Sequence, residues 1–124
     1  VSTRNGLKDS LRGNTSHVND SQDYTFENIA TFRALYKHSL TIRRSGCSAL
    51  DLAYVAAGRL DGFWANGLGV WDIAAGMLIA EEAGALTSNF LGDPDYKKSD
   101  HYLCATPKCF KQMLEAIKPN FKAH

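Results

Sequence analysis

The sequence lacks any apolar stretch long enough to cross a membrane. Its longest apolar run, Ile73–Ala80, has eight residues and contains a glycine, whereas a transmembrane helix needs about 20 residues. The sequence also lacks an excess of charge of either sign, because 14 lysines and arginines face 13 aspartates and glutamates, for a net charge of +1. We therefore expect no membrane association, and direct nucleic-acid binding is not indicated by the charge.

Cysteine is scarce, and its spacing is not that of a disulfide framework or a zinc site. The sequence has three cysteines, Cys47, Cys104 and Cys109, which is an odd number, and no two of them form a C-x-x-C pair. We interpret them as free thiols in a reducing compartment, which predicts a cytoplasmic protein. The sequence has no signal-like start. It begins with Val1 rather than Met, so we expect the gene product to begin upstream.

The sequence does contain enough apolar material for one folded domain. It has 124 residues, of which 44% are hydrophobic, with six Phe, five Tyr and two Trp. Hydrophobic spacing and turn residues predict four helices and four strands. The helices are expected at 23–37, 47–57, 72–83 and from 107 onward, and the strands at 40–43, 62–65, 86–88 and 102–105. This alternation favours a layered α/β domain.

Three further expectations concern loops and burial. The polar stretch 5–23, rich in Asn, Ser, Asp and Gly, is expected to form a loop. The helices at 47–57 and 72–83 are apolar almost all round, which is typical of helices buried on every side. Trp64 and Trp71 are expected in the core, and the four histidines, which show no metal-ligand spacing, are expected to be structural or exposed.

One acidic residue stands out because it opens an apolar helix after a glycine-rich turn. Asp72 follows Gly67, Gly69 and Trp71. One interpretation is that Asp72 is a helix N-cap, which accepts hydrogen bonds from free amides of the first turn. The other is that its carboxylate is held rigidly at the edge of a site, where its oxygens bind a hard cation. The two interpretations are compatible, since one carboxylate can do both.

A second segment pairs two cations with a glycine turn at the start of a helix. Residues 43–47 read Arg-Arg-Ser-Gly-Cys. The free amides of a helix start and nearby cations suit an anion such as phosphate. From the pattern alone, the simpler interpretation is an ordinary strand-to-helix turn with a solvated pair of arginines.

These two segments resemble the inositol monophosphatases of bacteria. The run from Arg43 to Trp64, RRSGCSALDLAYVAAGRLDGFW, is similar to the centre of those enzymes, and the run Trp71–Ala85, WDIAAGMLIAEEAGA, is similar to their C-terminal signature. The match is close from Leu40 to about Gly92. Within the family, the bacterial extragenic-suppressor type resembles the chain most.

The resemblance implies an enzyme that hydrolyses a phosphate monoester, in the first place inositol monophosphate, with Mg²⁺ as cofactor. Two or three Mg²⁺ ions in the full-length enzyme neutralise the phosphate and activate a water. The resemblance also implies that Asp72 is a metal ligand and that Gly46, Cys47 and Ser48 belong to the substrate-binding segment. It further implies a homodimer.

Two departures from the family pattern qualify these implications. A substrate-binding position seven residues before Asp72 is usually a Glu that accepts hydrogen bonds from inositol hydroxyls, and here it is Ala65. A lost hydrogen bond of that kind is worth about 1.5–3 kcal/mol, so we expect a looser or different sugar-phosphate preference. The resemblance implies that the family's other metal ligands lie in an N-terminal half, in a Glu-Glu stretch and an Asp-Pro-x-Asp-Gly-Thr motif, and neither of these N-terminal motifs occurs here.

The absence of the two N-terminal metal motifs indicates that this chain is half of an enzyme. We expect residues 1–124 to be the C-terminal α/β domain of a protein about twice as long, with its N-terminal domain absent from this chain. The implied architecture is the C-terminal layer of the sugar-phosphatase fold, a mixed sheet flanked by helices. Because one carboxylate alone holds Mg²⁺ weakly, the isolated chain is expected to be inactive.

Two other functions stay open. A phosphatase of the same class that acts on fructose bisphosphate, histidinol phosphate or a nucleotide phosphate fits the same motifs. Some bacterial members of the family are linked to RNA processing and transcription complexes. A non-catalytic interaction protein is therefore the alternative from another class.

Overall fold

The computed structural model describes residues 1–3, 11–16, 25–37, 41–43 and 47–120. The elements in chain order are β1 (Leu11–Ser16), α1 (Thr25–Lys37), β2 (Thr41–Arg43), α2 (Ser48–Ala56), β3 (Gly62–Asn66), α3 (Val70–Glu82), β4 (Leu86–Ser88), η1 (Tyr96–Lys98), β5 (His101–Ala105), α4 (Pro107–Ile117) and η2 (Lys118–Asn120). No helix in these ranges has the length and hydropathy needed to span a bilayer.

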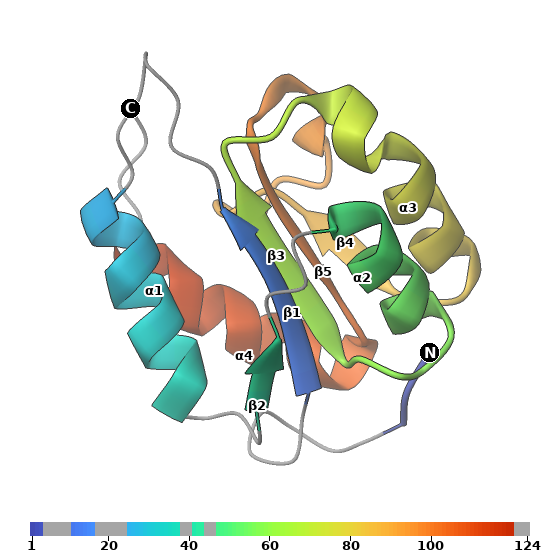
Figure 1. The fold of residues 1–124 in the computed structure, drawn as a ribbon, viewed down its shortest axis with the longest axis horizontal. Coiled ribbons are helices and arrows are strands. Elements are labelled where there is room, and N and C mark those ends of the chain that lie inside the picture. Colours follow the sequence, from blue (N-terminus) through green and yellow to red (C-terminus); the bar gives the residue numbers. More distant parts are fainter. Residues whose placement is uncertain (4–10, 17–24, 38–40, 44–46, 121–124) are drawn as a thin grey trace.

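The described strands form one mixed sheet in the order β2-β1-β3-β5-β4. Strand β1 is parallel to both of its neighbours, β2 and β3. Strand β5 is antiparallel to β3 and to β4. Helices cover both faces of the sheet, with α1 and α4 on one face and α2 and α3 on the other (Figure 1). The predicted mixed sheet flanked by helices is confirmed.

Alternation along β3 gives each face of the sheet its own core. Phe63 and Ala65 point to α2 and α3, while Trp64 between them points to α1 and α4. The core under α2 and α3 includes Leu52, Val55, Phe63, Ala65, Ile73, Met77, Ala80, Tyr102 and Cys104. The core under α1 and α4 includes Leu35, Trp64, Phe90, Leu103, Cys109, Met113 and Ile117.

The central strand β1 was not predicted, because the stretch 5–23 has the composition of a loop. Residues 11–16 instead pair on both sides, with β2 and with β3. Arg12 is fully buried there, and its Nη1 donates a hydrogen bond to the carbonyl of Leu35 at 3.4 Å. Burial lowers the pKa of Arg12 to about 10. Pairing with two strands thus overrides the local polarity of the sequence, and the rest of the stretch lies outside the described residues.

The two small-residue helices are buried on one side only, which corrects the expectation of burial all round. On α3 the buried residues are Ile73, Gly76, Met77 and Ala80. Its other sides expose Trp71, Leu78 and Ile79, and the side chain of Trp71 is 82% exposed. Trp71 is therefore not a core residue, whereas Trp64 is buried as expected. The prediction failed because it assumed a covering layer that the described residues do not provide.

Close packing between α2 and α3 depends on a glycine. A Cβ atom built on Gly76 would lie 2.7 Å from Leu52 Cδ1 and 2.8 Å from Leu52 Cβ. Leu52 is itself fully buried, so it has little room to move. Gly76 is thus kept in the middle of a helix, at a propensity cost of about 1 kcal/mol, because it lets the two helices approach.

We predict that Gly76→Ala destabilises the protein by about 1–2 kcal/mol, since the overpacking cost exceeds the gain in helix propensity. Urea unfolding measures the change. A Leu52→Ala background removes the contact at 2.7 Å with Cδ1 but keeps the contact at 2.8 Å with Cβ, so the same substitution should cost less there than in the unchanged protein. A stabilising effect of Gly76→Ala in the otherwise unchanged protein would show that the close approach is not limiting.

His101 holds the loop that follows β4. Its Nδ1 accepts a hydrogen bond from the amide of Phe90 at 3.0 Å, and the two rings lie 5.2 Å apart. Burial lowers the pKa of His101 below 6.5, against an opposing effect of Asp100. This histidine is a satisfied structural residue, as expected, while His17, His38 and His124 lie outside the described residues.

We predict that stability falls as the pH drops below about 6.5. The unfolded chain binds a proton on His101 at that pH, whereas the folded protein resists it. The contribution of His101 is therefore complete above pH 6.5 and decreases by up to about 1.4 kcal/mol per pH unit below it. His101→Asn keeps an acceptor but does not titrate, so urea midpoints between pH 8 and pH 5 should vary less in that variant. Parallel curves for the two proteins would contradict the assignment.

Candidate functional site

The order of the strands marks one edge of the sheet as the place for a site. The chain passes from β1 through α1 to β2, and then from β2 through α2 to β3, so that β2 and β3 lie on opposite sides of β1. The two connecting helices lie on opposite faces of the sheet. In open α/β sheets a ligand binds outside the carboxyl ends of the strands where the winding reverses in this way. The carboxyl ends of β1 and β3 are therefore the candidate site.

Two helices begin at this edge. In Figure 1, α2 and α3 both start at the end toward which the arrows of β1 and β3 point, and both run back along the sheet. Helix α3 follows β3 after three residues, Gly67–Gly69, and α2 follows β2 through a segment that lies partly outside the described residues. The positive ends of two helix dipoles thus lie near the carboxyl ends of the parallel strands.

Asp72 is fixed at the start of α3. It is the third residue of the helix, and its Oδ2 accepts a hydrogen bond from the amide of Gly69 at 3.1 Å. In return the amide of Asp72 donates to the carbonyl of Gly69 at 3.0 Å. The helix begins at Val70, two residues earlier than predicted. Asp72 is therefore not the N-cap residue itself, but it does satisfy the amide of the N-cap position, and its side chain stays exposed.

The turn before Asp72 is tied to the neighbouring strand β5. The amide of Gly67, which has a φ of +79°, donates to the carbonyl of Asp100 at 2.8 Å. The hydroxyl of Tyr102 lies within hydrogen-bond distance of two carbonyls, Leu68 at 2.9 Å and Ser99 at 2.7 Å. Burial, and then the negative charges of Asp100 and Asp72, raise the pKa of Tyr102 to about 12. Tyr102 therefore remains a donor at neutral pH and holds the turn in place.

Comparison with known proteins identifies the family to which this arrangement belongs. The sequence matches the inositol monophosphatase family over residues 1–121. The Nus factor SuhB of Pseudomonas aeruginosa is 43% identical over 121 residues, which are 97% of this chain and 45% of that protein. The Nus factor SuhB of Escherichia coli K12 is 42% identical over 98 residues, which are 79% of this chain and 37% of that protein.

Solved structures agree with the sequence match. The extragenic suppressor protein SuhB from Bartonella henselae superposes with a TM-score of 0.88 at 32% identity, over 98% of this chain and 46% of that one. The inositol monophosphatase from Anabaena superposes with a TM-score of 0.86 at 32% identity, over 96% of this chain and 48% of that one. The chain belongs to the inositol monophosphatase family. It spans less than half the length of these relatives, and its fold is the expected layer of the inositol monophosphatase fold.

The positions predicted for substrate binding differ in their setting. Cys47 is exposed and is the N-cap residue of α2, and Ser48 is the half-buried first residue of that helix. Both therefore lie at the same edge of the sheet as Asp72. Ala65 is fully buried in the core under α2 and α3, so its methyl group reaches no solvent in this chain. Gly46 lies outside the described residues.

Two residues near the site were not singled out from the sequence. One is Tyr102, whose role depends on a carbonyl 34 residues away, a contact that no local pattern reveals. The other is Asp51, a buried carboxylate in the first turn of α2. A Cβ atom on Gly13 of β1 would lie 2.9 Å from its Cγ, so the glycine makes room for this acid. The available signal for Asp51 was an acid in an otherwise apolar helix.

The donor set at this edge fits a hard cation only in part. A carboxylate oxygen is the ligand type that Mg²⁺ prefers, and Asp72 presents one at a fixed position. The described residues contain no group of three or more His, Cys, Asp or Glu side chains that could hold a metal ion. Asp72 therefore fits as one ligand of a family metal site whose remaining ligands come from elsewhere.

The structural role of Asp72 can be separated from any metal role by two substitutions. We predict that Asp72→Ala, which removes the acceptor for the Gly69 amide, destabilises the chain by about 0.5–1 kcal/mol. Asp72→Asn keeps an oxygen at that position and should cost less than half as much. Urea unfolding at pH 7 measures both. Equal losses would mean that the hydrogen bond to Gly69 does not stabilise α3.

Proposed function

We propose that this chain forms one side of the active site of a Mg²⁺-dependent phosphate monoester hydrolase, with Asp72 as a metal ligand. The observation that carries the proposal is the position of Asp72. Its carboxylate is exposed, tied to Gly69, and placed beside the carboxyl ends of β1 and β3. Membership of the inositol monophosphatase family supports the same reaction class.

The residues at this edge have distinct parts in the proposal. Asp72 contributes a negatively charged oxygen to the metal site. The segment Gly46, Cys47 and Ser48, of which Cys47 and Ser48 begin α2, contributes backbone amides and one small side chain to the binding of the phosphate or the sugar hydroxyls. When bound, Mg²⁺ neutralises the phosphate and lowers the pKa of a water. Tyr102 holds the turn that positions Asp72.

The site is incomplete without a second layer. Mg²⁺ is commonly held by more than one carboxylate together with waters and phosphate oxygens, and the relatives are about twice as long as this chain. Helix α3 carries an exposed apolar stripe at Trp71, Ala75 and Ile79, which suits a covering layer. We propose that residues 1–124 are the C-terminal layer, that two or three Mg²⁺ ions bind between the layers, and that the complete enzyme is a cytoplasmic homodimer.

Inositol monophosphate is the proposed substrate, with a selectivity that Ala65 loosens. A Glu at this position would accept hydrogen bonds from sugar hydroxyls, and a methyl group accepts none. Related sugar phosphates and nucleotide phosphates are therefore the alternative substrates.

A second candidate function comes from the names of the relatives. Proteins 42–43% identical to this chain are named Nus factor SuhB, which favours a role in a transcription complex. Such a role needs an interaction surface rather than a metal site. It would persist in an Asp72→Asn variant that no longer hydrolyses phosphate esters.

The proposed activity is tested in a chimera in which this chain replaces the matching segment of the Anabaena inositol monophosphatase. We expect Mg²⁺-dependent release of phosphate from the chimera and none from the isolated chain. Asp72→Asn should lower the rate by about a hundredfold or more, because the site loses a charged ligand. Asp95→Asn, which removes an exposed carboxylate from the segment before η1, is the matched control.

The same assay ranks inositol monophosphate, fructose bisphosphate and a nucleoside monophosphate as substrates. A preference for inositol monophosphate as strong as that of the Anabaena parent would refute the effect assigned to Ala65. Turnover by the isolated chain at the rate of the chimera, or full activity of Asp72→Asn, would refute the proposed site.

A further inference from the structure

A groove runs along one side of α3, away from the stripe that contains Trp71 and Ile79. It has a volume of about 420 Å³. Its residues are Val70, Ala74, Leu78 and Glu81 on α3, and Pro94, Asp95, Tyr96 and Lys97 on the segment that leads into η1. The four helix residues lie at spacings of four, four and three, so they form one continuous row along the helix.

The middle of the groove is apolar and its far end is acidic. Leu78 is 55% exposed, and Ala74 and Pro94 are exposed beside it. At the end of the row, Glu81 Oε1 accepts hydrogen bonds from Thr87 Oγ1 at 2.7 Å and from the Tyr96 hydroxyl at 3.2 Å. Both bonds go to Oε1, and they hold the carboxylate in place. The second oxygen, Oε2, can therefore accept a hydrogen bond from a partner molecule.

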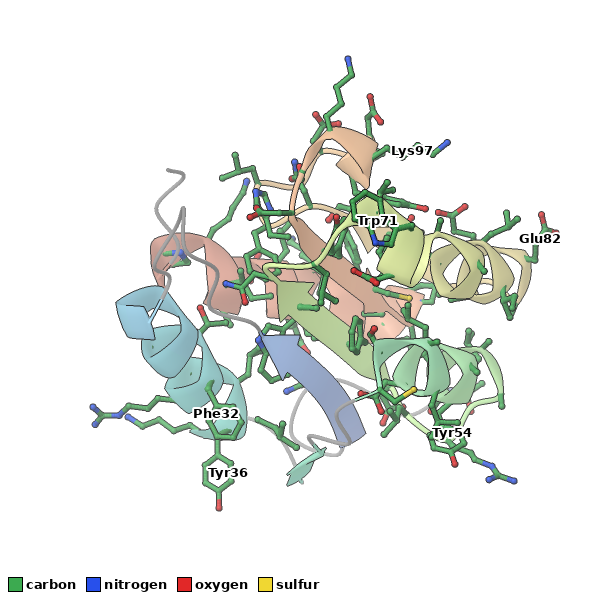
Figure 2. The ribbon with its side chains drawn as sticks, turned by 45° about the horizontal axis from the view of Figure 1, so that its top comes forward. Phe32, Tyr36, Tyr54, Trp71, Glu82 and Lys97 are labelled. Atoms are coloured by element: carbon green, nitrogen blue, oxygen red, sulfur yellow. The ribbon has the colours of Figure 1, made fainter. Side chains whose placement is uncertain are left out.

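The charge around the groove differs from that of the whole protein. The groove lining carries two carboxylates, Glu81 and Asp95, and one ammonium group, Lys97. The whole segment 70–100, with six Asp and Glu and two Lys, has a net charge of −4, in a chain whose overall charge is +1. Helix α3 itself has acidic residues and no basic one. Figure 2 shows Trp71 and Lys97 near the start of α3, while Glu82 points away from its far end. An acidic surface with an apolar centre repels a nucleic-acid backbone and attracts a cationic partner.

The length of the groove indicates the form of that partner. From Val70 to Glu81 the row extends over 11 helical steps, roughly 16 Å at 1.5 Å per residue. A partner helix of about three turns matches this length and places apolar side chains at spacings of four and three against Ala74 and Leu78. Two sides of α3 are thus exposed, and the side with the groove faces a wall formed by the segment that leads into η1.

We infer that the groove between α3 and η1 binds a basic amphipathic helix of a partner protein. Leu78 contacts the apolar residues of that helix, and Glu81 pairs with a Lys or Arg at its end. The inference is independent of the proposed phosphatase activity, because none of the groove residues belongs to the site at Asp72. It defines the partner by its chemistry and disfavours RNA as the occupant.

The test uses the 124-residue chain and a fluorescein-labelled helical peptide with leucines at spacings of four and three, flanked by arginines. Fluorescence anisotropy measures the binding of this peptide. A scrambled peptide of the same composition and a single-stranded RNA, each labelled in the same way, are measured for comparison. The matched pair of variants is Leu78→Ser and Ile79→Ser, because these neighbours are 55% and 53% exposed but only Leu78 lines the groove. Glu81→Gln and Glu82→Gln form a second pair, because Glu81 lines the groove and its neighbour Glu82 does not.

We expect the amphipathic peptide to bind about tenfold more tightly than the scrambled one. Leu78→Ser should weaken binding about tenfold and Ile79→Ser less than about twofold, since truncation of a central apolar contact dominates binding. Glu81→Gln should reduce the salt dependence of peptide binding more than Glu82→Gln does. Thermal unfolding of each variant checks that the fold is kept. Equal effects within either pair, equal binding of the scrambled peptide, no binding at millimolar peptide, or tighter binding of RNA would each overturn the inference.

Discussion

The hydrogen bond from the Gly69 amide to Asp72 Oδ2 is the interaction on which the candidate site depends. It joins the end of the turn after β3 to the first turn of α3, and so fixes an exposed carboxylate relative to the sheet. The turn itself is held by hydrogen bonds from the Gly67 amide to the carbonyl of Asp100, next to β5, and from the hydroxyl of Tyr102 on β5 to the carbonyl of Leu68. The position of Asp72 is therefore set by three hydrogen bonds that hold its carboxylate and the preceding turn, and not by burial of its side chain.

The same helix shows how one element serves several surfaces. Its buried side packs on α2 through the close approach of Gly76 and Leu52, where a side chain at position 76 would collide with Leu52. Its exposed sides carry neighbouring apolar residues, which are typical of a surface that contacts another layer or a partner. One exposed side suits the second layer of the proposed enzyme, and the other forms the acidic groove with η1. Helix α3 is thus buried on one side and exposes apolar residues on two others.

Residue patterns predict most of this fold but not its centre. The helices and the strands β2–β5 follow from hydrophobic spacing, glycines and turn residues, and their observed bounds differ from the predicted ones by only a few residues. Strand β1 escaped prediction because its sequence, LRGNTS, is polar, and its order comes from pairing with two strands distant in the chain. The exposure of Trp71 escaped prediction for a related reason, since local apolarity does not tell whether a covering layer is present.

At the site, the sequence identified Asp72 through two features, the glycine turn and the apolar helix after it. It did not identify Tyr102 or the groove, because both depend on segments that meet only in the folded chain. The central claim is that Asp72 binds a metal ion, and a crystal of the Anabaena chimera grown with Mn²⁺ tests it most directly. The account predicts anomalous density about 2.1–2.3 Å from an Asp72 carboxylate oxygen. Bound Mn²⁺ that leaves Asp72 without a metal contact would contradict it.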